Sequence, residues 1–396
     1  MGFVLSGVLS FIDRVIQCLG VVKSRFPDFL VPVTERSLDE FIEGFGRVGM
    51  LGGSEFVRSL DRGVRGSFCF CSIDSSSRSI GFIGFRLFVC GLSVFGPMGV
   101  VVVPGVGNVG ACFLALKSFR DFLVSVEEAN VGVRVKSVVG EYYVEDYKDD
   151  NICDELRLEL ENYGLTNIVS RYVDLIDFVL VDGPVYPTPP VMFLKGSDSR
   201  YVGAFRELIR RRVEIIKKLG RPVIGVVKRC EYSRKLCRVD RVVDYFRKVY
   251  SRDVGCSVED PVIVELIARK TMGEEYYSGI VLGPFTVSYD LDYMPPKVFW
   301  YICLNTPRGY SIFRVEVLKR HYERFGEDYI ESLVMWVSSN ISFRGIPVGI
   351  EIPDRYSRRL TAALYKEIVN RSYGLLNLTY DESNKYASVL RELEEE

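Results

Sequence analysis

Two apolar runs that each end in a single aspartate constrain the fold of this chain most strongly. One reads Cys69-Phe-Cys-Ser-Ile-Asp74, and about a hundred residues later the other reads Phe178-Val-Leu-Val-Asp182. Short apolar runs rich in β-branched and aromatic residues are typical of buried strands. An aspartate before glycine, as at Asp182-Gly183, is by itself most often a turn residue. Two such strands in one sheet would nevertheless hold two carboxylates rigidly, as a catalytic site requires.

The order of the predicted elements indicates how these strands are arranged. Three strands are predicted first, at 67–74, 79–90 and 92–103, and two more follow at 177–182 and 222–228. Helices are predicted at 105–130, 151–163, 199–219 and 354–370, and one additional strand at 132–144. The polar stretch 74–79 is predicted to be a hairpin. The order matches an α/β ribonuclease-H-like core, a mixed five-stranded sheet flanked by helices, with additional helices and strands. In that fold the first and fourth strands are neighbours, so Asp74 and Asp182 should meet.

The chain of 396 residues is long enough for a core domain with additions. We predict an N-terminal helical segment (1–62), the ribonuclease-H-like core (63–228), an inserted irregular α+β region (229–340), and a C-terminal part (341–396) that completes the core and ends in an acidic tail. Residues 1–20 form an amphipathic pattern, which either packs on the core or serves as a subunit or partner interface. Residues 34–61 are predicted to be largely helical.

Composition limits the location and the partners of the protein. No basic segment precedes the apolar N-terminus, and charged residues interrupt it, so we expect a cytoplasmic protein without a membrane span. The ten cysteines include no Cys-x-x-Cys pair, which argues for reduced thiols and against structural zinc; Cys230 and Cys237 are interpreted as ordinary small residues. With a net charge of −1, nucleic-acid binding must rely on local patches. An ATPase is disfavoured because the phosphate-loop motif is absent.

Further acids are candidates for a metal site with Asp74 and Asp182. Glu159 falls on the apolar stripe of the helix 151–163, and Glu155 adjoins it, whereas Glu161 should face solvent. Glu159 is either a ligand or a boundary residue. Asp354, at the start of the last helix, is a fourth acid. Clustered carboxylates bind hard cations such as Mn²⁺ or Mg²⁺, and two such ions can promote phosphodiester cleavage.

Cationic and aromatic residues are candidates for binding a nucleic-acid substrate. Lys228 ends the fifth strand and either contacts a phosphate or is solvated; Arg78 follows Asp74. Arg211 belongs to the basic face of the helix 199–219, together with Arg210, Arg212, Lys217 and Lys218, and that face either binds the DNA backbone or is simply solvated. Tyr186, in a proline-rich loop, is a candidate for stacking on a splayed base. The only histidine, His321, is interpreted as a helix-surface residue.

Several blocks in order resemble the NurA nucleases of archaea. They are Ser72–Ser79, Asp177–Pro184, Val223–Arg229, Phe313–Glu316 and Gly345–Asp354, and the resemblance covers about residues 65–370. It implies a manganese-dependent dimeric nuclease that acts with the hexameric HerA helicase-translocase in DNA end resection for recombinational repair. It also implies 5′→3′ exonuclease activity on single- and double-stranded DNA, and endonuclease activity on single strands. Asp74 and Asp182 would be the first- and fourth-strand metal ligands. The helix ligand would be Glu159, with Glu155 in reserve.

This sequence departs from the family pattern near its C-terminal end. Ile346 replaces a tyrosine that the family often carries, and Asp354 occupies the position of a His or Asp. A carboxylate still ligates a hard cation, but a proton relay through histidine is lost. One alternative is therefore a non-catalytic ribonuclease-H-like subunit that binds nucleic acid or a motor partner. An Argonaute-like nuclease is another alternative, but the chain is short for guide-binding domains.

Overall fold

The structure is a computed structural model, and it describes most of the chain. The described residues are 2–25, 46–52, 56–60, 67–105, 112–188, 199–228, 230, 233–251, 253–272, 276, 278–379, 381–382, 385–386 and 389–390. Most of the predicted helix 34–61 lies outside these residues. Its described end contains two short strands, β1 (Arg47–Met50) and β2 (Val57–Ser59), so a helix to residue 61 is wrong.

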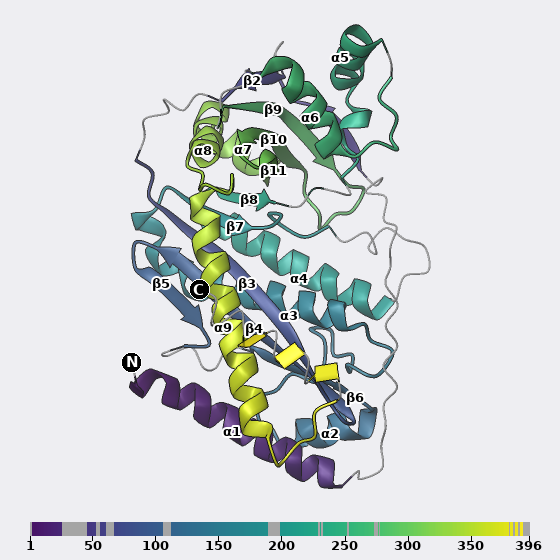
Figure 1. The fold of residues 1–396 in the computed structure, drawn as a ribbon, viewed down its shortest axis with the longest axis vertical. Coiled ribbons are helices and arrows are strands. Elements are labelled where there is room, and N and C mark those ends of the chain that lie inside the picture. Colours follow the sequence, from purple (N-terminus) through teal and green to yellow (C-terminus); the bar gives the residue numbers. More distant parts are fainter. Residues whose placement is uncertain are drawn as a thin grey trace.

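One mixed sheet of eleven strands runs through the molecule (Figure 1), with the order β1-β9-β10-β11-β8-β7-β3-β4-β5. Strand β2 pairs with β9, and β6 pairs with β4. The strands beyond β2 are β3 (Phe70–Phe82), β4 (Phe85–Gly96), β5 (Gly99–Val103), β6 (Leu114–Ser118), β7 (Phe178–Asp182), β8 (Val223–Val227), β9 (Gly279–Ser288), β10 (Lys297–Thr306) and β11 (Gly309–Leu318). Only β3–β7 and β7–β8, among these described pairings, are parallel. The predicted fold class, an α/β sheet flanked by helices, is confirmed.

The strand order β5-β4-β3-β7-β8 contains the predicted neighbours. The first, β3, pairs in parallel with the fourth, β7, so that Ile73 lies opposite Val181. This pairing brings Asp74 next to the end of β7. The predicted five-stranded sheet is too small, however, because β9, β10 and β11 from the region 229–340 extend the same sheet beyond β8.

Strand β3 is longer than the sequence predicts. Residues 74–79 are not a hairpin but the middle of a continuous strand, which pairs with β4 from Ser72 to Phe82. The chain reverses instead at 83–84, where Gly84 has a positive φ of 92°. The serine run suggested a turn by local preference, but cross-strand pairing and burial between two helices override that preference. Asp74 therefore lies inside a strand rather than at its end.

Helices cover both faces of this half of the sheet. Helix α9 (Val348–Ser372) crosses β3 and β4 on one face (Figure 1), and α3 (Asp149–Asn167) packs on the other. Helix α4 (Ser199–Lys218) packs outside α3, while α1 (Gly2–Ser24) packs against α2 (Arg120–Glu128) and α9. Instead of one helix over 105–130 and a strand over 132–144, the chain forms β6, α2 and isolated bridges.

The apolar face of α1 is buried, which agrees with core packing; Ile12 and Leu19 are fully buried. Nothing in the described residues tests the interface alternative for this helix. The domain limits likewise stay a prediction. None of the described helices combines the length and apolarity needed to cross a membrane.

The other half of the sheet also has two buried faces. Helices α7 (Lys319–Phe325) and α8 (Glu327–Ser339) lie on one face, and α5 (Asp240–Tyr250) and α6 (Asp260–Thr271) belong to the other. Alternation along β10 serves both layers, since Trp300 packs with α7 and α8 while Phe299 and Tyr301 pack on the α6 side. This explains why the strand reads as an unbroken apolar run.

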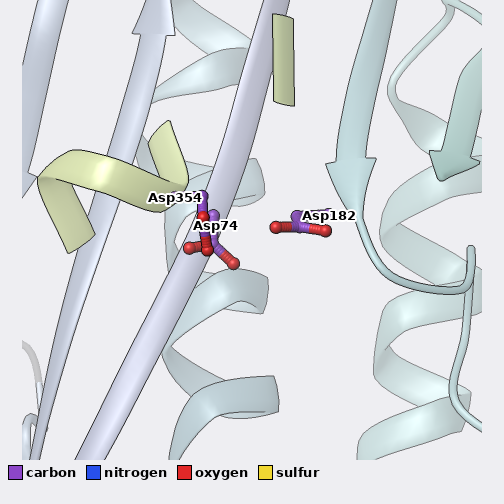
Figure 2. A group of neighbouring side chains, drawn as sticks. All are labelled: Asp74, Asp182 and Asp354. Atoms are coloured by element: carbon purple, nitrogen blue, oxygen red, sulfur yellow. The ribbon is translucent and has the colours of Figure 1, made fainter. Parts of the chain in front are cut away.

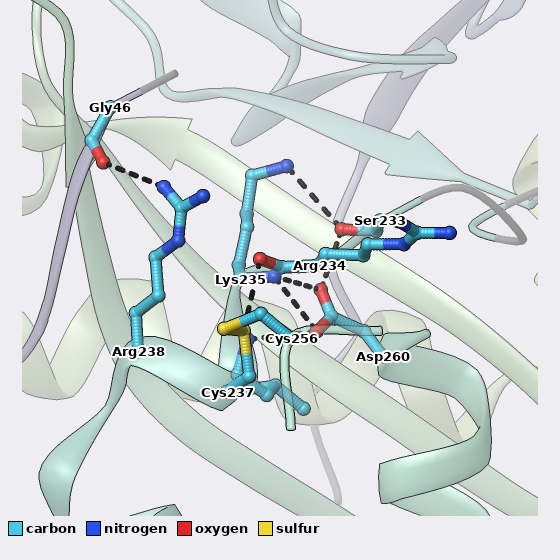
Figure 3. The surroundings of a disulfide bond; sticks show 9 residues. Gly46, Ser233, Arg234, Lys235, Cys237, Arg238, Cys256 and Asp260 are labelled. Atoms are coloured by element: carbon cyan, nitrogen blue, oxygen red, sulfur yellow. Dashed lines mark hydrogen bonds between the residues drawn. A yellow bond between two sulfur atoms is a disulfide. The ribbon is translucent and has the colours of Figure 1, made fainter. Parts of the chain in front are cut away.

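A disulfide contradicts the expectation that all thiols are reduced. Cys237 and Cys256 are bonded, and they tie the short 3₁₀ helix η3 (Leu236–Arg238) to the segment before α6 (Figure 3). Beside the bridge, the buried Asp260 accepts hydrogen bonds from the backbone N–H groups of Lys235 and Leu236. No local pattern marks the pair, because the two cysteines are 19 positions apart and meet only through tertiary structure.

Candidate metal centre

Three aspartates from distant parts of the chain meet at the junction of β3, β7 and α9. Asp74 comes from the middle of β3, Asp182 from the end of β7, and Asp354 from the second turn of α9. One carboxylate oxygen of each residue lies within 4.8 Å of the others. Figure 2 shows Asp74 and Asp354 together on one side, with the carboxylate of Asp182 pointing toward them. The helix begins six residues earlier than predicted, which places Asp354 over the sheet.

Local backbone geometry fixes Asp182. The next residue, Gly183, has a φ of 112°, a conformation that L side chains rarely adopt. The chain then passes so close to β8 that a Cβ on Gly225 would lie 2.5 Å from the backbone nitrogen of Val185. Buried Glu316 accepts a hydrogen bond from that same nitrogen at 2.8 Å. Glu316 is itself paired with Lys297, so a buried ion pair holds the turn that follows Asp182.

Asp74 is held by α9. The hydroxyl of Ser357 donates a hydrogen bond to its carboxylate, and Ser357 itself is fully buried. Close contact between the strand pair and the helix makes this possible, since a Cβ on Gly91 would lie 2.7 Å from the hydroxyl of Thr361. A larger residue at Gly91 would push the helix, and with it Ser357 and Asp354, away from the strand.

The site concentrates negative charge in a poorly hydrated place. Burial raises the pKa of Asp74 well above its usual range, and the nearby Asp182 carboxylate raises it further, against the hydrogen bond from Ser357. Burial also raises the pKa of Asp182 to about 6, although the Lys228 ammonium opposes this shift. Carboxylates that are buried together resist ionisation unless a cation compensates them.

Lys228 provides part of that compensation. Its Nζ lies 2.6 Å from Asp182 Oδ2 and 3.6 Å from Asp354 Oδ1. The predicted position at the end of the fifth strand thus brings Lys228 to the aspartates. One ammonium faces three carboxylates here, and Arg358 adds a further ion pair to Asp354 from the solvent side at 3.0 Å.

The donor set fits a hard divalent cation. Three carboxylates offer only oxygen ligands, which Mg²⁺ and Mn²⁺ prefer and which soft metals do not. A cation would also relieve the repulsion that raises the pKa values of Asp74 and Asp182. Asp74, Asp182 and Asp354 are therefore the residues that could hold a metal.

A fourth acid, on α3, influences this site electrostatically from the opposite face of β3, and it is not the predicted one. Glu161 accepts a hydrogen bond from Ser75 at 2.6 Å, directly beside Asp74, and its charge raises the pKa values of both Asp74 and Asp182. It is paired at 2.6 Å with the fully buried Arg212 of α4. The expectations that Glu161 faces solvent and that Arg212 belongs to a solvated basic face are both wrong.

Glu155 and Glu159 lie elsewhere on α3. Glu159 forms an ion pair with Arg134, and Glu155 is buried, with hydrogen bonds from Tyr143 and Tyr147. Each helical residue is rotated by about 100°, so Glu161 lies on nearly the opposite face from Glu159. The apolar stripe did not identify the glutamate nearest the site, because α3 is enclosed by the sheet and α4 and has buried residues on several sides. Burial raises the pKa of Glu155 to about 7.

Two other predicted residues are buried, in contrast to expectation. Tyr186 is fully buried, and its hydroxyl donates to the Pro295 carbonyl, so it cannot stack on a base. His321 is not on the surface; its Nδ1 accepts a hydrogen bond from the Val223 backbone N–H at 3.5 Å. Burial, together with Arg324 and Arg320, lowers the pKa of His321 to about 4. It is neutral at pH 7.

The remaining predicted cations lie beside other parts of α9 and α4. Arg78 lies four residues beyond Asp74 on the same side of β3, near Tyr365 of α9. Arg211 lies on the exposed side of α4 and pairs with Glu207 one turn away at 2.8 Å. This exposed ion pair agrees with the alternative that Arg211 belongs to a solvated face of the helix. Such a pair contributes little to stability.

Comparison with known proteins gives one family and a set of similar structures. The model of the NurA domain matches residues 69–359, and no curated protein matches the chain. The crystal structure of the NurA nuclease from Sulfolobus solfataricus is 13% identical, with a TM-score of 0.40, and the match covers 78% of this chain and 86% of that one. A crystal structure of NurA with manganese is 8% identical, with a TM-score of 0.39 and coverage of 76% and 88%. One of NurA bound to dAMP and manganese is 7% identical, with a TM-score of 0.37 and coverage of 73% and 84%.

Proposed function

The chain belongs to the NurA family, and from this and its three clustered aspartates we propose that it is a metal-dependent nuclease that hydrolyses DNA phosphodiesters. The observation that carries the proposal is the convergence of Asp74, Asp182 and Asp354 within 4.8 Å, from two strands and a helix that the family match spans. Two of the similar structures carry manganese, and one of them also carries dAMP, which supports Mn²⁺ as the cation and a nucleotide as the ligand.

The proposed roles of the residues follow from their contacts. Asp74, Asp182 and Asp354 hold the cation, and Ser357 fixes the orientation of Asp74. When bound, divalent cations supply the positive charge that activates an attacking water and stabilises the leaving oxygen. Lys228 lies at the same point, where its ammonium group would contact the scissile phosphate.

Proton transfer by histidine has no place in this mechanism. The only histidine of the chain, His321, is buried, and burial lowers its pKa to about 4. Its Nδ1 accepts a hydrogen bond from the backbone N–H of Val223 in β8. Asp354 occupies the position where the family has a His or Asp, and its side chain is 22% exposed beside Lys228. A cation ligand in place of an imidazole gives a site that depends on metal for all its chemistry.

The experiment that tests the proposal is a nuclease assay with Mn²⁺ and with excess chelator. We expect the wild-type chain to digest labelled DNA only with metal, and Asp74→Ala and Asp182→Ala to lose this activity while remaining folded. Asp290→Ala is the matched control, because the Asp290 side chain is 85% exposed and lies just beyond β9, which β10, β11 and β8 separate from β7. Full activity of either site variant, or activity in chelator, would contradict the proposal. DNA binding without any turnover would favour a non-catalytic subunit.

The proposal extends to the finer activities and partners that family membership suggests. These are 5′→3′ exonuclease and single-strand endonuclease activity, a homodimer, and action with a HerA-type hexameric ATPase in DNA end resection for recombinational repair. End-labelled and circular single-stranded substrates separate the first two activities. Light scattering, alone and after mixing with such an ATPase, tests the assemblies; a monomer that does not bind the ATPase would contradict them.

A further inference from the structure

Among the described residues, an exposed phenylalanine beside the start of α9 belongs to none of the hydrophobic core clusters. Phe343 lies in the loop between α8 and α9, and it is 63% exposed. The guanidinium groups of Arg308 and Arg344 lie 5.8 and 5.6 Å from the centre of its ring. Arg308 comes from the turn between β10 and β11, so two separate segments bring positive charge to one exposed aromatic ring.

The loop that carries Phe343 is held in place by hydrogen bonds. Ser342 N–H donates to the Ile346 carbonyl at 2.8 Å, and Gly345 N–H donates to the Ser342 carbonyl at 2.9 Å. The hydroxyl of Ser311 on β11 donates to the Gly345 carbonyl, also at 2.9 Å. Gly345 is required here, because its φ is 73° and a Cβ would lie 2.7 Å from the Cβ of Ser311. Phe343 is thus presented on a fixed support.

The arginine turn on the other side is also fixed. The Thr306 hydroxyl donates to the Gly309 carbonyl at 2.7 Å and accepts from the Arg308 N–H at 3.3 Å. A fixed, exposed aromatic ring with two cations meets the requirements for binding a nucleobase and its phosphates at low conformational cost. A purely apolar protein partner would not match the two flanking charges.

The loop faces the same side of α9 as the metal centre. Arg344 pairs with Glu351 at 3.6 Å. Glu351 and Asp354 are three residues apart in α9, so they are neighbours on one face, with about 5–6 Å between their Cβ atoms. Helix α9 begins beside α8 and then crosses β3 (Figure 1), so it connects the loop to the three aspartates over about two helical turns.

We propose that Phe343, Arg308 and Arg344 form a stacking platform that binds single-stranded nucleic acid a few nucleotides from the metal centre. The base stacks on the ring of Phe343, and the two arginines contact the flanking phosphates. The inference rests on the proposed nuclease function and deepens it, because it assigns the path by which an unpaired strand reaches the aspartates. Recognition of this kind is tolerant of sequence, since every base has a face on which to stack.

Equilibrium binding in chelator tests the platform separately from hydrolysis. The full chain is titrated into a fluorescent oligo(dT) of about 20 nucleotides and into a blunt duplex of equal length, and anisotropy is recorded. We expect Phe343→Ala to weaken oligo(dT) binding at least about fivefold, Phe343→Trp to restore it, and duplex binding to change less. Arg308→Gln and Arg344→Gln should each reduce the slope of log K against log salt by about one.

Tyr373→Ala is the matched control. Tyr373 is a 91% exposed aromatic residue just beyond the other end of α9, and its removal should leave binding unchanged. The proposal is overturned if wild type does not bind oligo(dT), if Phe343→Ala binds as wild type does, or if the control loses equal affinity. A change in oligomeric state with unchanged strand affinity would instead assign the ring to a protein contact. Because no hydrolysis is measured, an inactive chain with Phe343-dependent binding refutes the nuclease proposal alone.

Discussion

Replacing Asp182 by asparagine should make the metal-free protein more stable while abolishing its proposed activity. Ionisation of Asp182 is unfavourable in the folded chain, because burial raises its pKa from 3.8 to about 6 even with Lys228 alongside. That difference corresponds to about 3 kcal/mol of unfolding free energy. The unfolded chain releases this proton at lower pH, so the destabilisation is absent below pH 3.8, grows between the two values and is complete above pH 6.

Asparagine has nearly the same shape and carries no charge, and its Oδ1 can still accept from Lys228. At pH 8 in chelator, urea unfolding should therefore show Asp182→Asn to be more stable than wild type by up to about 3 kcal/mol. At pH 3.5 the two proteins should be equal. Asp290→Asn, at an exposed position with an ion pair to Arg47, should differ from wild type by less than about 0.5 kcal/mol at both pH values.

Manganese should reverse this order. A ligand that binds only the folded state adds about 4.1 kcal/mol of stability at a thousand times its dissociation constant, which exceeds the advantage of the variant in chelator. The variant lacks one of the three carboxylates that would bind the cation, so it should gain less. The reasoning is refuted if Asp182→Asn is less stable than wild type in chelator at pH 8. It is equally refuted if Mn²⁺ stabilises both proteins by the same amount, because the aspartates would then not be the metal site.

Three further predictions concern the framework around the site. Wild type should lose about 3 kcal/mol of stability as the pH falls from 6.5 to about 4, because the folded protein resists protonation of the buried His321 ring. His321→Asn should not show this loss. Urea unfolding across that pH range measures both proteins, and parallel pH profiles would contradict the prediction. Reduction of the Cys237–Cys256 disulfide should lower the stability of wild type by about 3 kcal/mol, the value for closing a loop of this length. Reductant should not change the stability of Cys237→Ser. Equal responses of the two proteins in unfolding curves would refute the bond. Arg212→Met should lower stability by about 3–5 kcal/mol, because it leaves the Glu161 carboxylate without its buried partner. Combining Arg212→Met with Glu161→Gln should recover much of this loss. A double variant no more stable than Arg212→Met would show that the unpaired charge is not the cause.

Local sequence information was sufficient for the strands that carry Asp74 and Asp182 but not for the exact ends of the elements. The apolar runs indicated the strands, and their order, which matches a ribonuclease-H-like core, predicted that β3 and β7 are neighbours, as they are. The serine run after Asp74 was misread as a hairpin, because its preference for turns is local whereas pairing with β4 is not. The same limit applies to the strands beyond β8, whose membership of one sheet depends on contacts between distant segments.

The direction of individual side chains was the least predictable feature. The sequence favoured Glu159 over Glu161 as the helix ligand. Glu161 pairs with Arg212, a buried arginine on the neighbouring amphipathic helix, and a search for such a pair could have favoured Glu161. Tyr186 and His321 looked accessible in loop-like and basic sequence contexts, yet the packing of β7, β8 and β10 encloses both. Phe343, which the sequence did not distinguish from core aromatics, is exposed in the loop between α8 and α9.

The sequence alone determined which strands exist near the site, their order, and the carboxylates and lysine that they deliver, because alternation and apolar burial are encoded within a few neighbouring residues. Only the tertiary structure decided which helix face meets the sheet, which glutamate lies beside Asp74, and which cysteines are bonded. Those outcomes depend on how α3, α4 and α9 pack around the strands, and packing is a property of residues brought together from hundreds of positions apart.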